Sequence, residues 1–303
     1  MPTIVAFLDV LGFRNYTNED LDGACRLLGH QEFILRLKLQ DKKLYPPSSY
    51  PDPSLAALAE SHLVDSFKHF LPFSDSIFIV SETPDKFARQ LSHFLIECFS
   101  FVAHAYDNAD NPNAPENVKV MQFPGFATRE EKWYPPLYRG GLSIGDVVVG
   151  GVTGIENGGE MRMPNLAGPA AVKAVLIEKQ FRGPRLFCEA GFENNFSPDV
   201  RHFFRPVTVA VSELLWPAFV FNPNNKAQTE MTEFYKLWGP ALGLWKSKRG
   251  DDAFEHYDEF LRLLVRSCLK WAEAAGYSKE ARRILHKWVS QDLSTDLVES
   301  YLE

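Results

Sequence analysis

Two aspartates in short apolar motifs are the residues best suited to chemistry in this 303-residue chain. Asp9 lies in the segment FLDVLGF, and Asp75 lies in FSDSIFIV. A carboxylate at the end of a buried strand is costly unless its charge is compensated. If both side chains meet at one edge of a sheet, a divalent cation between them would remove their mutual repulsion. Each has an ordinary interpretation as well, since Asp9 could cap the following turn and Asp75 could be a simple turn residue.

The patterns around these motifs predict the strands that would bring the two aspartates together. Residues 3–8 form an apolar run with β-branched members, which is typical of a buried strand, and a helix is expected from about Asn18. Residues 67–73 and 76–81 are predicted to form a hairpin around the turn Ser74-Asp75. A second long helix is expected to begin at Thr83-Pro84, with the threonine as its N-cap.

The rest of the chain predicts a mixed fold followed by helices. An insert rich in Asn and Pro at residues 107–136 is expected to be a long loop, either functional or disordered. A long strand at 137–149, a helix from Gly168 and a strand at 184–188 follow. This order predicts an α+β fold with a ferredoxin-like, mainly antiparallel sheet. We expect this domain to span residues 1–222, and a helical C-terminal extension to span 223–303, with helices near 226–247, 251–275 and 278–300.

Composition narrows the classes of protein. The formal net charge of −7 argues against a nucleic-acid-binding protein, which usually presents a basic face. The apolar N-terminal segment is interrupted by Asp9 and has no basic region before it, so it predicts neither a signal peptide nor a membrane span. The four cysteines show no CxxC spacing and are expected to be reduced and buried. These features together predict a cytoplasmic protein without a membrane partner.

Four segments in order, FLDVLGF, FSDSIFIV, RGGLSIGDVVVGG and GPAAVKAVLIEK, resemble the class III nucleotidyl cyclase homology domain. The resemblance covers roughly residues 3–190. It implies a class III nucleotidyl cyclase fold in which Asp9, Asp75 and the main-chain carbonyl of Val10 hold two divalent metal ions, Mn²⁺ or Mg²⁺. It also implies a homodimer with active sites shared between subunits, and a phosphate cradle formed by the N–H groups of Gly12, Phe13 and Arg14.

Several positions depart from the pattern of adenine-using cyclases. The position that usually carries the base-reading lysine is Leu71, and the position of the base-reading aspartate is Asn165, so both are candidate base-binding residues. The asparagine and arginine that stabilise the transition state in the family correspond here to Val172 and Leu176, which cannot form such hydrogen bonds.

Other residues are candidates for these missing roles. Arg139 is the candidate catalytic cation, with a structural ion pair as its alternative, and Arg14 and Lys173 are further candidates that would otherwise be surface charges. Tyr50 could stack on a base, although a surface aromatic is the ordinary interpretation.

These departures have two interpretations. The chain is similar to the bacterial pyrimidine cyclases of the Pycsar anti-phage systems, which implies conversion of a pyrimidine nucleoside triphosphate, UTP before CTP, into its 3′,5′-cyclic monophosphate and pyrophosphate. The cyclic product would be a second messenger in anti-phage defence. The alternative is a catalytically silent cyclase-like module that senses nucleotides or mediates dimerisation.

Overall fold

The computed structural model describes residues 3–103, 117–122, 127–132, 136–156, 159–221, 232–247, 250, 254–293 and 300–302. The helices are α1 (Phe13–Glu19), α2 (Leu21–Leu44), α3 (Pro53–Ser61), α4 (Pro84–Ala103), α5 (Pro169–Glu178), α6 (Pro198–Arg201), α7 (Thr232–Ser247), α8 (Phe254–Ala274) and α9 (Ser278–Asp292). The strands are β1 (Ile4–Val10), β2 (His69–Phe73), β3 (Ser76–Ser81), β4 (Asn117–Gln122), β5 (Ala127–Lys132), β6 (Tyr138–Ile144), β7 (Val148–Glu156), β8 (Gly159–Ala167), β9 (Leu186–Glu189), β10 (Phe204–Pro206) and β11 (Val211–Leu214). Short 3₁₀ turns are η1 (Pro47–Ser49), η3 (Phe192–Asn195) and η4 (Trp216–Val220).

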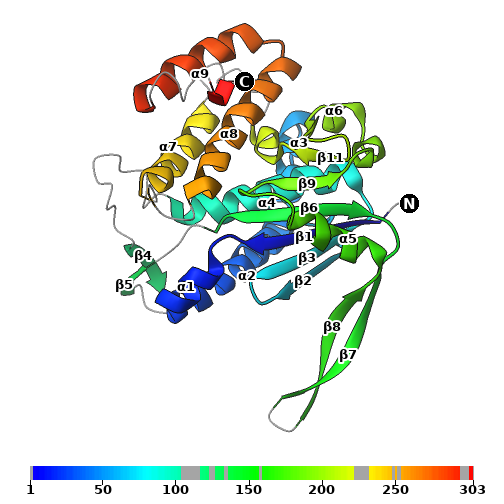
Figure 1. Ribbon diagram of the computed structural model, residues 1–303. Helices are drawn as coiled ribbons and strands as arrows, with labels where there is room; N and C mark the ends of the chain where they lie inside the picture. Colours follow the sequence, from blue (N-terminus) through cyan, green and yellow to red (C-terminus); the bar gives the residue numbers. More distant parts are fainter. Residues whose placement is uncertain are drawn as a thin grey trace.

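A seven-stranded sheet with β1 near its centre organises the molecule (Figure 1). Its strand order is β10-β11-β9-β6-β1-β3-β2, and β1 is antiparallel to both β3 and β6. The order β6-β1-β3-β2 corresponds to 4-1-3-2 in a βαββαβ unit, which is the ferredoxin-like arrangement. The predicted α+β, ferredoxin-like fold is therefore confirmed. Beyond this unit, β7, β8 and α5 connect β6 to the parallel strand β9.

The two faces of the sheet are covered differently because side chains alternate along β1. Its residues Ile4, Ala6 and Leu8 belong to the main core, which contains the apolar face of α4. Val5 packs instead against the small residues of α5, Ala170 and Ala174 among them. Asp9 has the same parity as Val5, so it lies on the α5 face, at the end of β1 that leads into α1.

The C-terminal helices α7 and α8 are joined to this core. Trp238 of α7 and Leu264 of α8 belong to the same apolar cluster as Leu91 of α4 and Leu8 of β1. Trp216 of η4 stacks on Phe260 of α8, with ring centroids 6.3 Å apart. The helical character of the described C-terminal part is as predicted, but α9 ends at Asp292 and not near residue 300. The division at residues 222 and 223 lies outside the described residues and stays a prediction.

The structure corrects several expected elements. The first helix begins at Phe13, directly after the left-handed Gly12 (φ 78°), and α2 begins at Leu21, so the single helix expected from Asn18 is wrong. The long strand expected at 137–149 ends at Ile144, because the chain turns at Gly145 (φ 148°). The glycine-rich segment after it forms the β7–β8 arm, which projects from the body of the molecule (Figure 1). Within the insert, β4 and β5 form a two-stranded ladder where only a loop was expected.

Two further expectations from the sequence concern the cysteines and the helices. Three cysteines are buried as expected, but Cys25 on α2 is exposed. In the described part of the chain, none of the helices combines the length and apolar character needed to cross a bilayer.

Candidate functional site

The pairing of β1 with its two neighbours places the aspartates side by side. Asp9 is opposite Ser76 of β3 on one side and opposite Arg139 of β6 on the other. The Val10 N–H donates to the carbonyl of Asp75 over 3.0 Å, so the hairpin turn lies beside the end of β1. The backbone segments that carry Asp9 and Asp75 therefore lie side by side, as expected.

The hairpin turn that carries Asp75 is under local strain. Ser74 has a φ of 55°, in the left-handed region that residues other than glycine rarely adopt. A two-residue connection between antiparallel strands favours positive φ, which explains why Ser74 adopts it. Asp75 itself is half-buried, and its side chain forms no hydrogen bond or ion pair with another residue of the described part of the chain.

Asp9 is held by two neighbours on its own face of the sheet. The Ser76 hydroxyl donates to Oδ1 of Asp9 over 3.0 Å. Arg139 donates to the other oxygen, from Nη2 at 3.1 Å and from Nε at 3.3 Å. The Asp9 side chain is 19% exposed and that of Arg139 is 31% exposed, so this ion pair is partly screened from water.

Glu178, at the end of α5, is a third charged group that sequence reasoning missed. It forms an ion pair with Nε of Arg139, and its own side chain is only 2% exposed. Burial raises the pKa of Glu178, the charge of Arg139 lowers it, and the charge of Asp9 raises it further. One signal was available in the sequence: Glu178 follows Ala174 by four residues and so lies on the buried face of α5.

Asp9 and Asp75 supply only part of the oxygen ligands that a hard divalent cation needs. No group of three or more His, Cys, Asp or Glu side chains placed to hold a metal occurs in the described part of the chain. A divalent cation at Asp9 and Asp75 would therefore take its remaining ligands from main-chain carbonyls, water and phosphate oxygens, which is the habit of Mg²⁺. It would also compete with Arg139 for one oxygen of Asp9.

The proposed phosphate cradle begins immediately after this site. Leu11 donates its N–H to the Leu137 carbonyl, and Gly12 precedes α1, so Phe13 and Arg14 form the first helical turn. First-turn N–H groups have no acceptor inside their own helix. Arg14 is exposed.

The remaining candidates are spread over the fold. Leu71 of β2 is 5% exposed and is opposite Phe78, on the same face of the sheet as Asp9. Asn165 is exposed on β8, and its side chain accepts a hydrogen bond from the N–H of Leu166. Since β6 runs from beside Val10 to beside Ile4, the arm that carries Asn165 starts at the opposite end of β1 from Asp9.

The α5 candidates and Tyr50 do not reach Asp9 either. Val172 and Leu176 point away from the core and are 59% and 57% exposed. Lys173 forms an ion pair with Glu189 over 3.1 Å. Tyr50 follows η1, which packs on α3, and α3 packs on α4, the helix that covers the opposite face of the sheet from α5.

No family model matches the chain, and no curated protein matches it. Among solved structures, adenylate cyclases from Trypanosoma brucei in their monomeric state are similar, with a TM-score of 0.38 and 12% identity over 70% of this chain and 87% of that chain. The guanylyl cyclase Cya2 is similar as well, with a TM-score of 0.37 and 14% identity over 70% of this chain and 90% of that chain.

Proposed function

We propose that the chain is a metal-dependent nucleotidyl cyclase that converts a pyrimidine nucleoside triphosphate, UTP before CTP, into its 3′,5′-cyclic monophosphate and pyrophosphate. The observation that supports it most is the pairing of Asp9 with Ser76, which places Asp75 beside Val10. Two carboxylates and main-chain oxygens at the end of a buried strand are the ligand types that divalent cations prefer. We further propose that the cyclic product is a second messenger in anti-phage defence, on the resemblance of the sequence motifs.

In this reaction the ribose 3′-hydroxyl gives its proton to a water molecule, and its oxygen forms a bond to the α-phosphorus. The bond from that phosphorus to the α,β-bridging oxygen breaks, and pyrophosphate leaves with the electron pair. Two divalent cations held by Asp9, Asp75 and the Val10 carbonyl would lower the pKa of the 3′-hydroxyl and offset the phosphate charge. Arg139 pairs with Glu178 through Nε and donates to Asp9 from both Nε and Nη2, so a phosphate oxygen would compete with Asp9 for the Nη2 donor.

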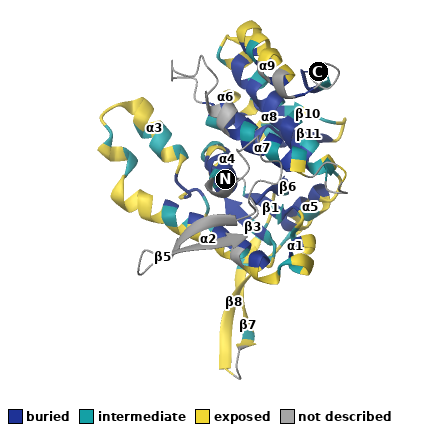
Figure 2. Cartoon of the chain, turned by 90° about the vertical axis from the view of Figure 1, so that its left-hand side faces the viewer, coloured by how far each residue is buried: buried dark blue, intermediate teal, exposed yellow. Residues whose placement is uncertain are grey.

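A homodimer is part of the proposal, because the metal-binding candidates and the base-binding candidate Asn165 lie far apart within one protomer. Asp9 lies at one end of β1, and Asn165 lies on the arm that begins at the other end. A head-to-tail pair would bring the arm of one protomer to the aspartates of its partner. The arm is exposed along most of its length (Figure 2), with Val148 70% exposed and Ile155 81% exposed, and an isolated apolar hairpin of this kind is a candidate contact surface.

The second candidate function is a silent cyclase-like module. Val172 and Leu176 favour it, because neither side chain can hydrogen-bond a developing negative charge, and both are exposed. The retained pair Asp9 and Asp75 favours the enzyme, since a silent module has no need of two adjacent carboxylates.

Incubation of the purified chain with ATP, GTP, CTP and UTP in turn, each with Mn²⁺, followed by chromatography, tests the proposal. We expect cyclic UMP, with less cyclic CMP. Asp9→Asn and Asp75→Asn should each lower the rate by more than about 100-fold, the upper range for loss of a group that only orients a metal ligand. Asp199→Asn, which removes an exposed carboxylate on α6, is the matched control and should leave the rate unchanged.

Three results would count against parts of this proposal. If light scattering shows a dimer and chromatography finds no cyclic product, the silent module is favoured. Product formation that survives both aspartate changes would refute the metal assignment. Preferred use of ATP or GTP would refute the pyrimidine assignment and leave the cyclase reaction standing.

A further inference from the structure

A pocket lies at the junction of the sheet with the C-terminal helices, away from the aspartates. It has a volume of about 470 Å³ and is lined by residues of β10, α8, α9 and the C-terminal turn. Six of its lining residues are polar, and we call this group the basic pocket: Arg205, Arg266, Lys270, Glu273, Ser278 and Arg282. Pockets of 300–1,000 Å³ are the usual size for small-molecule sites.

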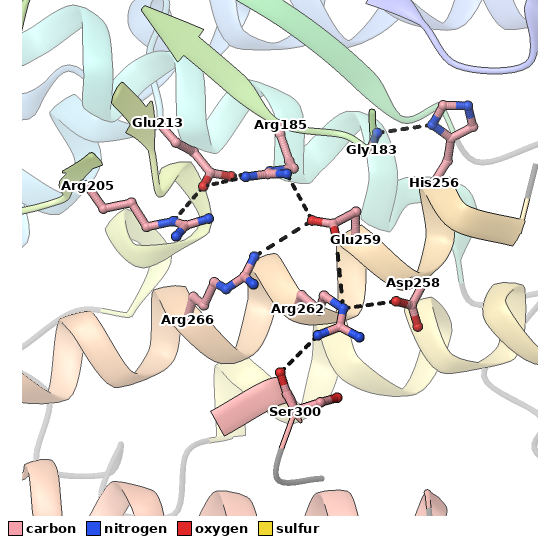
Figure 3. Close-up of polar contacts among 10 residues, drawn as sticks. All are labelled: Gly183, Arg185, Arg205, Glu213, His256, Asp258, Glu259, Arg262, Arg266 and Ser300. Atoms are coloured by element: carbon pink, nitrogen blue, oxygen red, sulfur yellow. Dashed lines mark hydrogen bonds and ion pairs between the residues drawn. The ribbon is translucent and has the colours of Figure 1, made fainter. Parts of the chain in front are cut away.

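The carboxylates around the basic pocket do not balance its cations. Glu213 accepts from Arg205 over 2.6 Å, but the same carboxylate also binds Arg185. Glu259 is similarly shared, at 3.0 Å from Arg185, 3.7 Å from Arg266 and 3.9 Å from Arg262. Figure 3 shows this network, in which four arginines meet three carboxylates, Glu213, Asp258 and Glu259.

The other lining charges add a second excess cation. Lys270 and Glu273 form an ion pair at 2.7 Å, so their charges cancel. Arg282 donates to the carbonyl of Leu302 over 3.3 Å, and no carboxylate in the described part of the chain pairs with it. The described residues therefore leave the pocket with an excess of about two positive charges, one from the network and one from Arg282.

Arg266 is the cation least satisfied by its surroundings. Its side chain is 23% exposed, and its carboxylate partner, Glu259, is 3.7 Å away, beyond ordinary hydrogen-bond length. Burial and the nearby charge of Arg205 lower its pKa. An anion in the pocket would relieve this repulsion, and a guanidinium offers several donors in the planar geometry that suits phosphate.

The start of α9 adds a second, independent feature. Ser278 is the first residue of this 15-residue helix, and no side chain caps its N-terminus. Its first N–H groups have no acceptor inside the helix, and the helix dipole favours a negative charge there. Because Ser278 and Arg282 both line the pocket, the helix start and the guanidinium of the next turn face the same space.

We propose that the basic pocket binds a small phosphorylated anion, with Arg266 and Arg282 as its main donors and Ser278 and the start of α9 completing the site. A concave pocket of this volume holds a small molecule, whereas a protein or nucleic-acid partner would need a broad surface. The site is separate from Asp9 and Asp75, so it stands independently of the proposed cyclase reaction.

Calorimetric titration with pyrophosphate in buffer that contains EDTA tests this proposal, since removal of divalent cations disables the aspartate site. We expect one site with a Kd below about 1 mM, and binding that weakens several-fold between 0.05 and 0.2 M salt. Asp75→Asn should bind as the wild type does. Arg266→Gln and Arg282→Gln should each raise the Kd at least about fivefold, the effect of losing one charged hydrogen-bond partner.

Arg283→Gln is the matched control, because Arg283 is the next residue on α9, is 67% exposed and pairs with Glu280 outside the pocket. It should keep the Kd within about twofold of the wild type. Arg282 is exposed, so its variant is expected to fold even where Arg266→Gln does not, and the melting temperature of each variant reports this.

Absence of binding to the wild type would overturn the proposal, as would equal weakening by Arg282→Gln and Arg283→Gln. A parallel titration with UTP and AMP distinguishes the sources of phosphate. Tighter binding of a nucleotide than of pyrophosphate identifies a nucleotide site, and tighter binding of pyrophosphate identifies an inorganic polyphosphate site.

Discussion

Among single residues, the charge balance at Asp9 decides what the end of β1 can hold. Asp9 and Glu178 share one guanidinium, that of Arg139, and Asp75 adds a further carboxylate beside Val10. Three carboxylates against one guanidinium leave an excess of two negative charges, which one divalent cation would neutralise. Arg139 contacts Oδ2 of Asp9, so a cation that binds this oxygen would have to displace Arg139 from it.

His30 gives a prediction for acid stability. It lies on α2, 2% exposed, with Nε2 3.3 Å from the Cys98 carbonyl. Burial lowers its pKa from 6.5 to about 4, although the hydrogen bond raises it slightly. The folded pKa lies below the unfolded one, so the neutral ring contributes stability above pH 6.5 that is lost as the pH falls toward 4. This lowering of the pKa corresponds to at most about 3 kcal/mol of folding free energy.

His30→Gln should therefore flatten the pH dependence of unfolding in that window. Urea unfolding at pH 7, 6, 5 and 4.5 measures it, and the comparison is of slopes, because the substitution also changes packing. His286→Gln on α9, where the histidine is exposed, should keep the wild-type slope. The pH dependence of His30→Gln should not vanish, because His93 is also buried and also has a lowered pKa. Identical slopes for His30→Gln and the wild type would contradict the prediction.

At the level of elements, the docking of α5 on β6 depends on the absence of a side chain at Gly141. A Cβ built there would lie 1.9 Å from the carbonyl oxygen of Ala174, a backbone atom that cannot move without the helix. Gly141→Ala should displace α5, and with it Glu178, at a cost of at least about 3 kcal/mol, the upper range for overpacking. Gly150→Ala on β7 is the matched control, because nothing lies within 4 Å of its Cβ position.

Thermal and urea unfolding of the two glycine variants measures this difference. Gly150→Ala should unfold close to the wild type, and Gly141→Ala should unfold at clearly lower urea or fail to fold. Equal stability of the two variants would show that α5 can shift to accept the methyl group.

The elements also show what the sequence could predict and why the rest was missed. The hairpin at Asp75 was predictable because the apolar, β-branched run IFIV follows the turn pair Ser74-Asp75, and the strand at Asp9 was predictable because residues 4–8 are apolar. The β7–β8 arm was missed because its glycines suggest a loop, although residues 160–163 alternate between polar and apolar side chains.

In the candidate site, too, some contacts follow from sequence patterns and others do not. The meeting of Asp9 with the Asp75 turn depends on the pairing of β1 with β3. The hydrophobic pattern predicted the two strands but left their pairing as a condition. The contact between Arg139 and Glu178 depends on the packing of a helix across a sheet, which no local pattern encodes. Only the ion pair of Arg139 with a carboxylate at the sheet edge was anticipated, as the alternative to a catalytic role.

At the scale of the whole molecule, a charged network connects α8 to the sheet that carries the site. Arg185 precedes β9 and binds Glu213 of β11 and Glu259 of α8. Its carbonyl accepts the N–H of Gly140, the residue after Arg139. The position of α8 is therefore linked, through one residue and one main-chain bond, to the strand that holds the candidate catalytic arginine.

Glu213 is the group on which this network depends. Its side chain is 0% exposed, and it accepts from Arg185 through Nε at 2.6 Å and Nη2 at 3.0 Å, and from Arg205 at 2.6 Å. Glu213→Gln would leave two guanidiniums facing each other across a neutral amide. Breaking a buried pair from one side costs about 3–5 kcal/mol, because the remaining charge has no compensation.

Urea unfolding followed by tryptophan fluorescence and far-ultraviolet circular dichroism measures this loss, with Glu280→Gln as its matched control. Glu280 pairs with Arg283 on the exposed face of α9, where such pairs contribute at most about 1 kcal/mol. We expect Glu213→Gln to lower the unfolding free energy several times more than Glu280→Gln does. Both probes should report one transition, because α8 and the sheet share one core. Two separate transitions in the wild type, or equal losses in the two variants, would mean that the helices fold as an independent unit and that the network does not couple them to the site.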